Sequence, residues 1–207
     1  MVGDVNLLAI LLAALAASLS PGPASLAIAG TSMARGRRAG LLLTTGIMFG
    51  SLAWSIAAAL GLGALMLANA WVFEIIRYAG AGYLIFLTWK SARSAMSKKA
   101  VETKAISGGP KTLIARGAAL HITNPKSVLF FGALYSIGMP VDANALQLAT
   151  VVGAVGLQAT LVYTGYAVLF SAPSMTQLYV RLRRWFESVF AIGFAFAGFK
   201  VLTARLQ

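Results

Sequence analysis

Two short segments carry residue types that could contact a small polar molecule. The first is Ser-Pro-Gly-Pro-Ala-Ser at residues 20–25. Two prolines around a glycine cannot continue a regular helix, because proline lacks the backbone N–H and clashes with the preceding turn. Upstream carbonyl groups lose their helical partners, and the chain must bend. The hydroxyls of Ser20 and Ser25 either satisfy these carbonyls or face a bound molecule. A purely structural kink is the alternative.

The second segment is His-Ile-Thr-Asn-Pro-Lys at residues 121–126. Lys126 lies about ten residues from either end of an apolar run, or ~15 Å along a helix. An ammonium group at that depth in a membrane costs a few kcal/mol, and such residues usually pair or line a polar path. The alternative is a structural partner for carbonyls freed at Pro21 and Pro125. His121, the single histidine, is either a packed side chain or a proton carrier.

Residue types needed for other chemistries are scarce. The chain has no cysteine, which excludes disulfides, thiolate metal sites and a cysteine nucleophile. Its five acidic residues form no pair in the sequence. Glu74 and Glu187 lie near apolar runs but close to their ends, and Glu74 is expected to pair with Arg77. We therefore expect no enzyme activity, no cofactor and no metal site.

The elements that position these residues are predicted to be membrane helices. Of the 207 residues, 59% are hydrophobic and 11% charged, and the mean hydropathy is +0.81. A soluble domain needs more charge to cover its surface. The apolar runs lie at 7–30, 39–70, 72–89, 117–138, 145–171 and 186–203, each long enough to cross ~30 Å of hydrocarbon. We predict an all-α fold with six transmembrane helices.

Two of these runs have features of their own. No basic residue precedes the first run, so it is expected to be a retained span rather than a signal peptide. The second run is longer than one crossing needs. It must either tilt or unwind after Gly61 and Gly63.

Basic residues alternate between the gaps and so predict the orientation. The gaps after the first, third and fifth runs hold thirteen Lys and Arg residues, whereas the opposite side holds only Lys200 and Arg205. By the positive-inside rule both termini lie outside the cytoplasm and the basic loops inside it. The net charge of +12 is therefore assigned to contact with anionic lipid rather than to nucleic-acid binding.

The chain is predicted to contain two inverted three-helix repeats. Residues 1–90 form the first repeat, 91–116 a basic cytoplasmic linker with a flexible breaker at 107–110, and 117–207 the second repeat. An odd number of spans per half inverts one half relative to the other. Pro21 and Pro125 then break the first helix of each half at a similar depth. Interrupted helices in inverted repeats are typical of secondary transporters, whose sites lie near the midplane.

Four motifs in order resemble the LysE/RhtB family of amino-acid exporters. They are LSPGPAS, ARGRRAG, YAGAGYLIFLTWK and ITNPKSVLFF, and they cover roughly residues 18–131. The resemblance implies a small bacterial inner-membrane protein that exports amino acids or their derivatives, driven by the proton motive force. The expected partners include a second copy of the chain, in a homodimer. Residues and resemblance together give these substrate-binding or translocation candidates: Ser20, Pro21, Gly22, Pro23, Ser25, His121, Asn124, Pro125 and Lys126.

Two departures from the family pattern bear on the substrate. Ala24 follows Pro-Gly-Pro, and Ser51 follows Gly50, at positions where members often carry polar or acidic residues. A cationic side chain would require a deep carboxylate, so the sequence favours a neutral or zwitterionic amino acid over lysine or arginine. A passive pore or a membrane scaffold without transport is the alternative. Export of heavy metal ions is disfavoured by the absence of cysteine.

The expected mechanism places the two broken helices face to face across the halves. Backbone N–H groups and the Lys126 ammonium would receive the substrate carboxylate. Freed carbonyls and serine hydroxyls would receive its ammonium. The halves would then rock to open the site to alternate sides of the membrane.

Overall fold

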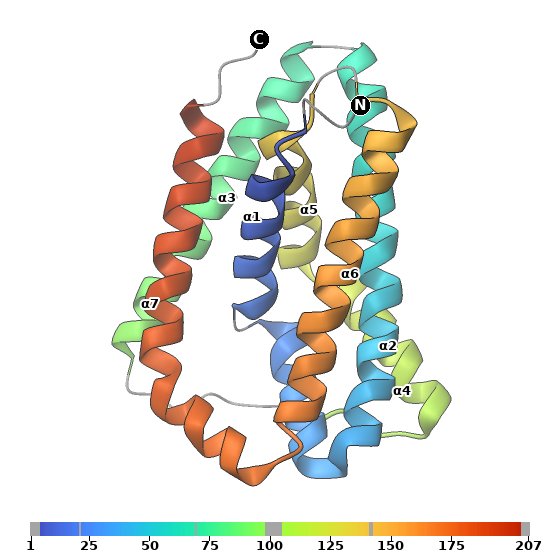
Figure 1. The fold of residues 1–207 in the computed structure, drawn as a ribbon, viewed down its shortest axis with the longest axis vertical. Helices are drawn as coiled ribbons and strands as arrows, with labels where there is room; N and C mark the ends of the chain where they lie inside the picture. The colour runs from blue at the N-terminus through green and yellow to red at the C-terminus, as the bar shows by residue number, and fades with distance from the viewer. Residues whose placement is uncertain (1–4, 21, 69, 98–104, 141–142, 204–207) are drawn as a thin grey trace.

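The computed structural model describes residues 5–20, 22–68, 70–97, 105–140 and 143–203. Within these residues every regular element is an α-helix, so the all-α prediction is confirmed. The helices are α1 (Leu7–Leu19), α2 (Pro23–Ala68), α3 (Ala70–Met96), α4 (Pro110–Ile122), α5 (Pro125–Gly138), α6 (Ala145–Leu169) and α7 (Pro173–Thr203). They pack side by side into one elongated bundle (Figure 1).

Polar caps and prolines determine where several helices begin. The side chains of Asn6, Asn124 and Asn144 accept hydrogen bonds from backbone N–H groups in the first turns of α1, α5 and α6. Pro110 and Pro125 occupy the first turns of α4 and α5, where a missing N–H costs no hydrogen bond. Local sequence therefore determines where these four helices begin, including α5 at the second break.

Helix α2 bends sharply at Gly36. This residue has φ 81° and ψ 173°, a conformation that is essentially restricted to glycine. The first part of α2 continues downward from α1 in Figure 1, and the second part returns the full height of the bundle. The second part stays helical past Gly61 and Gly63 to Ala68, so the unwinding alternative for this run is wrong.

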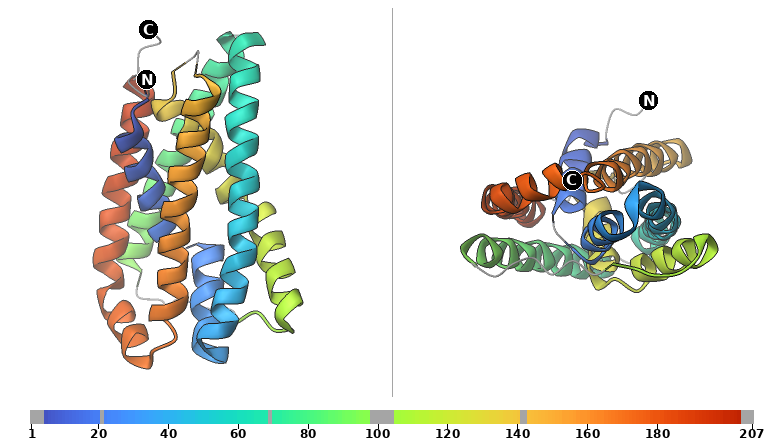
Figure 2. Two further views of the ribbon diagram at one scale, coloured as in Figure 1. Left: turned by 45° about the vertical axis from the view of Figure 1, so that its right-hand side comes forward. Right: turned by 90° about the horizontal axis from the view of Figure 1, so that it is seen from below.

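Different segments of the chain lie at the two ends of the bundle. In Figure 1 both marked termini lie at the upper end, whereas the bend of α2, the start of α4 and the α6–α7 connection lie at the lower end. From the top, α1 and the first part of α2 run downward, α2 returns and α3 descends. From the bottom, α4 and α5 run upward, α6 descends and α7 returns (Figures 1 and 2).

The lower end joins the two halves of the chain through Arg35. Its guanidinium donates to the carbonyl oxygens of Ile106 (3.1 Å) and Gly108 (2.9 Å). The backbone N–H of Ile106 donates to the Thr31 hydroxyl at 2.9 Å. The segment before α4, predicted as a flexible breaker, is thus held against the first part of α2.

Large apolar side chains cover the outside of the bundle. On α6 and α7 they include Leu146, Leu157, Leu161, Trp185, Ile192 and Phe196, each more than 60% exposed. A soluble monomer rarely exposes so much contiguous apolar surface. This surface matches a surrounding of lipid.

Two helices of the described chain are long and apolar enough to cross a membrane by themselves. They are Pro23–Gly61 and Ala145–Leu169, and Leu7–Leu19 is apolar but shorter. The half helices α1 and α4 have 13 residues each, or ~20 Å. Either half helix alone is therefore shorter than a crossing of ~30 Å.

The interior contains two apolar clusters. The first gathers side chains of α1, α3, α5, α6 and α7, among them Ile10, Leu84, Leu134, Val151 and Phe194. The second lies between α2 and α6 and includes Ile28, Leu43, Ile47 and Ala167. The polar residues identified from the sequence meet between these two clusters.

Candidate functional site

The first break separates α1 from α2. Ser20 leaves the helix with φ −66° and ψ 132°, and α2 begins at Pro23. The Ser25 hydroxyl accepts from the backbone N–H of Gly22 at 2.9 Å and lies 3.2 Å from the Gly22 carbonyl oxygen. Ser25 therefore stabilises the turn itself. Pro21 lies outside the described residues.

The second break separates α4 from α5. Thr123 and Asn124 lie between the helices, and the Asn124 side chain accepts from the backbone N–H of Lys126 at 3.1 Å. The predicted break is present, and it lies directly before Pro125. Pro125 begins α5 under the Asn124 cap. Two half helices meet here end to end.

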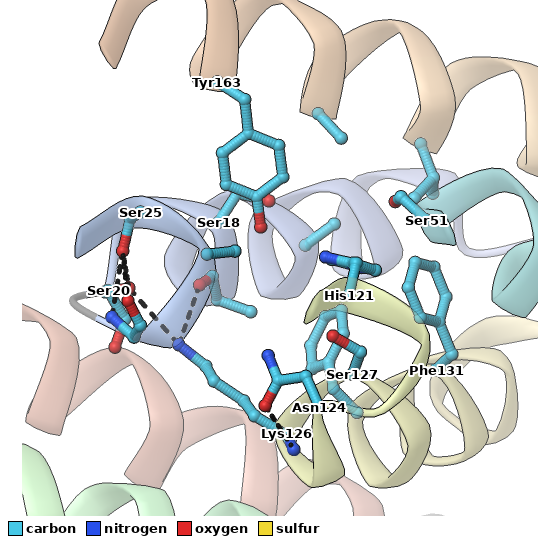
Figure 3. Close-up of a pocket in the computed structure, with 17 residues that line it drawn as sticks. Ser18, Ser20, Ser25, Ser51, His121, Asn124, Lys126, Ser127, Phe131 and Tyr163 are labelled. Atoms are coloured by element: carbon cyan, nitrogen blue, oxygen red, sulfur yellow. Dashed lines mark hydrogen bonds between the residues drawn. The ribbon is translucent and has the colours of Figure 1, made fainter. Parts of the chain in front are cut away.

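Lys126 joins the two breaks. Its Nζ donates to the carbonyl oxygens of Ala17 (3.2 Å) and Ser20 (3.3 Å), at the end of α1 (Figure 3). A Cβ at Gly22 would lie 3.2 Å from this Nζ, so the glycine leaves room for the close approach. Lys126 therefore donates to carbonyl groups that the break leaves without helical partners, which is the structural role given as the alternative in the sequence analysis. It also faces a cavity.

Each long helix caps the break of the other half. The Tyr166 hydroxyl on α6 donates to the Leu19 carbonyl at 2.7 Å. The Trp54 indole N–H on α2 donates to the Ile122 carbonyl at 3.1 Å. These bonds satisfy carbonyls that have no water available within hydrocarbon. The sequence analysis identified neither Trp54 nor Tyr166 as a site residue.

A cavity of about 40 Å³ lies where the breaks meet. Such a space holds water molecules but no amino acid. One side is apolar, with Ala14, Ala17, Phe130, Phe131, Val155 and Ala159. The polar side chains around it are Ser18, Ser20, Ser25, Ser51, His121, Asn124, Lys126, Ser127 and Tyr163 (Figure 3).

The structure brings together most of the predicted site residues. Gly22 lines the cavity with the predicted polar residues, whereas Pro23 does not. The side chain of Pro125 is outside the described part. Ala24 and Ser51, the two departures from the family pattern, both line the cavity. A change at either position therefore alters the cavity wall.

His121 is 3% exposed and contacts Tyr163 edge to face, with ring centroids 6.4 Å apart. Neither ring nitrogen has a hydrogen-bond partner among the described residues. A buried polar group without a partner is costly. The imidazole therefore offers hydrogen-bonding capacity to whatever occupies the cavity.

Glu187 is a buried acid that the sequence analysis left out of the site. It lies at the start of the last apolar run, and α7 begins before that run, at Pro173, so Glu187 is near the middle of the helix. It is 4% exposed, and its Oε1 accepts from the Ser94 hydroxyl at 2.7 Å. Pro173 was the available signal, because proline favours the first turn of a helix.

Comparisons with known proteins place the chain in a family. The family model described as LysE type translocator matches residues 15–205. The chain is 29% identical to a threonine efflux protein of Salmonella typhi over 192 residues, covering 89% of this chain and 90% of the relative. It is 28% identical to a threonine efflux protein of Escherichia coli K12 with the same coverage.

A third relative spans nearly all of both chains. The leucine efflux protein of Klebsiella pneumoniae is 27% identical over 208 residues, covering 99% of this chain and 97% of the relative. No solved structure matches. The family match extends through both broken helix pairs and over most of the sequence, and its members are membrane transport proteins rather than enzymes. The chain belongs to the LysE type translocator family.

Proposed function

We propose that this protein exports neutral or zwitterionic amino acids, or their derivatives, from the cytoplasm. Its relatives, which are named threonine and leucine efflux proteins, support this substrate class. The observation that carries the proposal is Lys126. Its ammonium lies at the junction of two broken helices and at the wall of a polar cavity. An amino acid needs a cation for its carboxylate and oxygen acceptors for its ammonium, and the junction offers both.

We further propose six crossings of a bacterial inner membrane as two inverted halves. The pairs α1 with the first part of α2, and α4 with α5, each make one crossing. The second part of α2, α3, α6 and α7 make the other four. Helix α1 begins and helix α7 ends at the upper end of the bundle in Figure 1, whereas the bend of α2, the end of α3 and the start of α4 lie at the lower end. The sequence has basic residues at each of these three lower places. This supports termini outside and basic loops in the cytoplasm. Those loops then contact anionic lipid.

In the proposed bound state the carboxylate takes the place of the carbonyl groups at Lys126. The Ala17 and Ser20 carbonyls released in this exchange, with nearby serine hydroxyls, then accept from the substrate ammonium. The apolar wall around Val155 and Phe131 faces the substrate side chain. When the substrate leaves, Lys126 returns to the α1 carbonyls and serves as an internal cation that resets the carrier.

The proposed transport step is alternating access. The cavity of about 40 Å³ is too small for an amino acid, so the halves must move apart to admit one. This narrow space favours a carrier over a passive pore, which needs a continuous aqueous path. Protons are the proposed coupling ion. The mechanism works within one chain, so a homodimer would contain two separate pathways.

Efflux from preloaded cells tests the proposal. Cells expressing the chain are loaded with dipeptides of threonine, leucine and other neutral residues, and the released amino acid is measured outside. Lys126→Met should lower export by about 10- to 100-fold, because charge-assisted hydrogen bonds contribute about 1.5–3 kcal/mol. Pro125→Ala should also reduce export, because the half-helix start is weakened. Collapse of the proton gradient should stop export.

The matched control is Lys111→Met, which removes an exposed lysine of α4 far from the cavity. Membrane insertion of every variant is checked by its abundance in isolated membranes. If well-inserted Lys126→Met and Pro125→Ala chains export at the normal rate, the proposal is wrong. Release that does not saturate with internal amino acid would indicate a pore, and no release of any amino acid would favour a scaffold.

A further inference from the structure

A second, larger cavity adjoins the first at Lys126. It has a volume of about 300 Å³ and is enclosed by α2, α3, α5 and α7. Ser20, Gly22 and Lys126 belong to the walls of both cavities. Leu26 also lines the second cavity and lies beyond the break, on the part of α2 that runs to the basic end. The second cavity is therefore on the side of Lys126 that we assign to the cytoplasm.

Three charged side chains from three different helices line this cavity: Lys90 of α3, Lys126 of α5 and Glu187 of α7. Glu187 is the most deeply buried of them, and the Ser94 hydroxyl orients its carboxylate. Lys90 is exposed and lies near the end of α3, at the outer edge of the cavity. Ionisable residues at membrane depth usually mark substrate or ion pathways.

The charges match an amino acid in its zwitterionic form. The ligand carries one ammonium and one carboxylate on adjacent atoms, and the cavity presents a carboxylate together with two ammonium groups. A carboxylate has about four acceptor positions, so Glu187 can keep its partners within the protein, Ser94 among them, and still accept from a ligand ammonium. The volume lies at the lower end of the range typical of small-molecule sites, about 300–1,000 Å³.

We propose that this second cavity is the loading site for free α-amino acids arriving from the cytoplasm. Glu187 receives the α-ammonium, and Lys90 and Lys126 receive the α-carboxylate. The amino acid then passes Lys126, the shared wall residue, into the central cavity as the halves move. This proposal rests on the proposed amino-acid export and adds a requirement for a free α-ammonium, set by Glu187.

The requirement separates two ligands of nearly equal size. Leucine and its 2-hydroxy acid share the side chain and the carboxylate, but the hydroxy acid lacks the ammonium. Without it, the buried Glu187 carboxylate loses a cationic partner, and sites built for a polar group reject analogues that lack it. The wild-type chain should therefore load leucine and exclude its hydroxy acid.

The experiment uses inside-out membrane vesicles that contain the full chain and face the basic loops to the medium. Uptake of labelled L-leucine, and separately of L-threonine, is measured over a range of concentrations, with and without the corresponding 2-hydroxy acid as competitor. The wild type should prefer the amino acid by at least about tenfold. Glu187→Gln should raise the half-saturation concentration by about tenfold or more and remove most of this preference.

Two further variants keep the result interpretable. Lys90→Met changes an exposed position and should fold normally, and it should raise half-saturation for the amino acid and for the hydroxy acid alike. Ser188→Ala removes the exposed hydroxyl next to Glu187 on α7 and should leave both values unchanged. The contrast between Glu187→Gln and Lys90→Met isolates recognition of the ammonium.

The outcomes distinguish the two proposals. If the wild type transports neither amino acid nor any other neutral amino acid, the proposed function and the loading site both fail. If the wild type transports the amino acid, and the Glu187→Gln variant prefers it over the hydroxy acid as strongly as the wild type does, only the loading-site proposal is wrong. Unchanged half-saturation in both Glu187→Gln and Lys90→Met would overturn it in the same way.

Discussion

The site depends on the backbone carbonyl groups at the ends of α1 and α4. A helix that stops inside a membrane leaves its last carbonyls without intrahelical partners. Lys126 bonds to Ala17 and Ser20, and Tyr166 bonds to Leu19, across 106 to 147 residues of sequence. Trp54 performs the same role for Ile122. The broken helices are stable because the opposite half supplies the missing donors.

Trp54→Phe tests this account at the scale of one hydrogen bond. Phenylalanine keeps an aromatic, apolar side chain, although a smaller one, and the Ile122 carbonyl loses its donor. An unsatisfied carbonyl in an apolar surrounding costs about 1–3 kcal/mol. We expect the purified variant to show a lower midpoint of thermal unfolding than the wild type in the same detergent.

Trp185→Phe provides the control, because Trp185 is 74% exposed on the outside of α7. It should unfold at nearly the wild-type temperature. Equal midpoints for Trp54→Phe and Trp185→Phe would contradict a capping role for Trp54.

Sequence reasoning identified the residues that are unusual for their place in a membrane helix. Lys126, the Pro-Gly-Pro turn and Asn124 stand out because charge, proline and amide are costly in hydrocarbon. Trp54 and Tyr166 do not stand out, because aromatic residues are ordinary there. Their importance comes from the carbonyls they meet, 68 and 147 residues away, and a single sequence does not reveal such a meeting.

At the scale of elements, α2 and α4 approach each other closely along glycines. A Cβ at Gly46 would overlap the Ile114 carbonyl oxygen, and a Cβ at Gly117 would overlap that of Leu43. Gly50 gives similar room to His121, whose Cβ would lie 2.9 Å from a Cβ added there. Small residues permit this backbone proximity in membranes. The α2–α4 contact thus places His121 at the cavity.

Gly46→Ala should therefore destabilise the bundle although alanine favours helices. The added methyl group meets backbone rather than a movable side chain, and such overpacking costs about 1–3 kcal/mol or more. We expect less folded protein in membranes and a lower unfolding midpoint.

Gly153→Ala is the matched control within α6, because among the described residues nothing outside its own stretch of helix lies within 4 Å of the added Cβ. Alanine there should be neutral or slightly stabilising, by up to about 1 kcal/mol. Equal behaviour of the two variants would mean that α2 and α4 do not pack as closely as described.

The bend in α2 depends on Gly36 for a different reason. Beyond the neighbouring backbone, no atom of the residues that the structure describes lies within 4 Å of an added Cβ, but the positive φ of 81° disfavours any side chain. Gly36→Ala should cost about 1–3 kcal/mol through backbone strain alone. Gly109→Ala, at φ −74° and equally open, should cost far less. Thermal unfolding of the two purified variants measures the difference.

At the scale of the whole molecule, apolar runs and charge alternation predicted an all-helical membrane protein. They did not predict the ends of the helices. Lys90 and Arg93 belong to α3, and Lys111 and Arg116 belong to α4, because helices extend beyond the apolar stretches. For the same reason Glu187, at the start of the last apolar run, lies near the middle of α7. Hydropathy indicates which residues can lie in lipid, whereas backbone hydrogen bonding determines where a helix ends.

The orientation can be tested directly because the chain has no cysteine. Ala105→Cys and Ala145→Cys each introduce one thiol at an exposed position, near opposite ends of the bundle. A membrane-impermeant maleimide added to intact cells should label Ala145→Cys only. Ala105→Cys should react after the membrane is opened. Labelling of Ala105→Cys in intact cells would contradict the proposed orientation.

The crosswise caps have a consequence for synthesis. The ribosome completes α1 and the turn at Ser20 long before it reaches Lys126 and Tyr166, which supply donors to that turn. Until then the nascent first half holds exposed carbonyl groups in the bilayer. A chain that terminates after α3 never receives those donors. Such truncated chains should be recognised and degraded by membrane proteases, so that quality control of this transporter depends on completion of its second half.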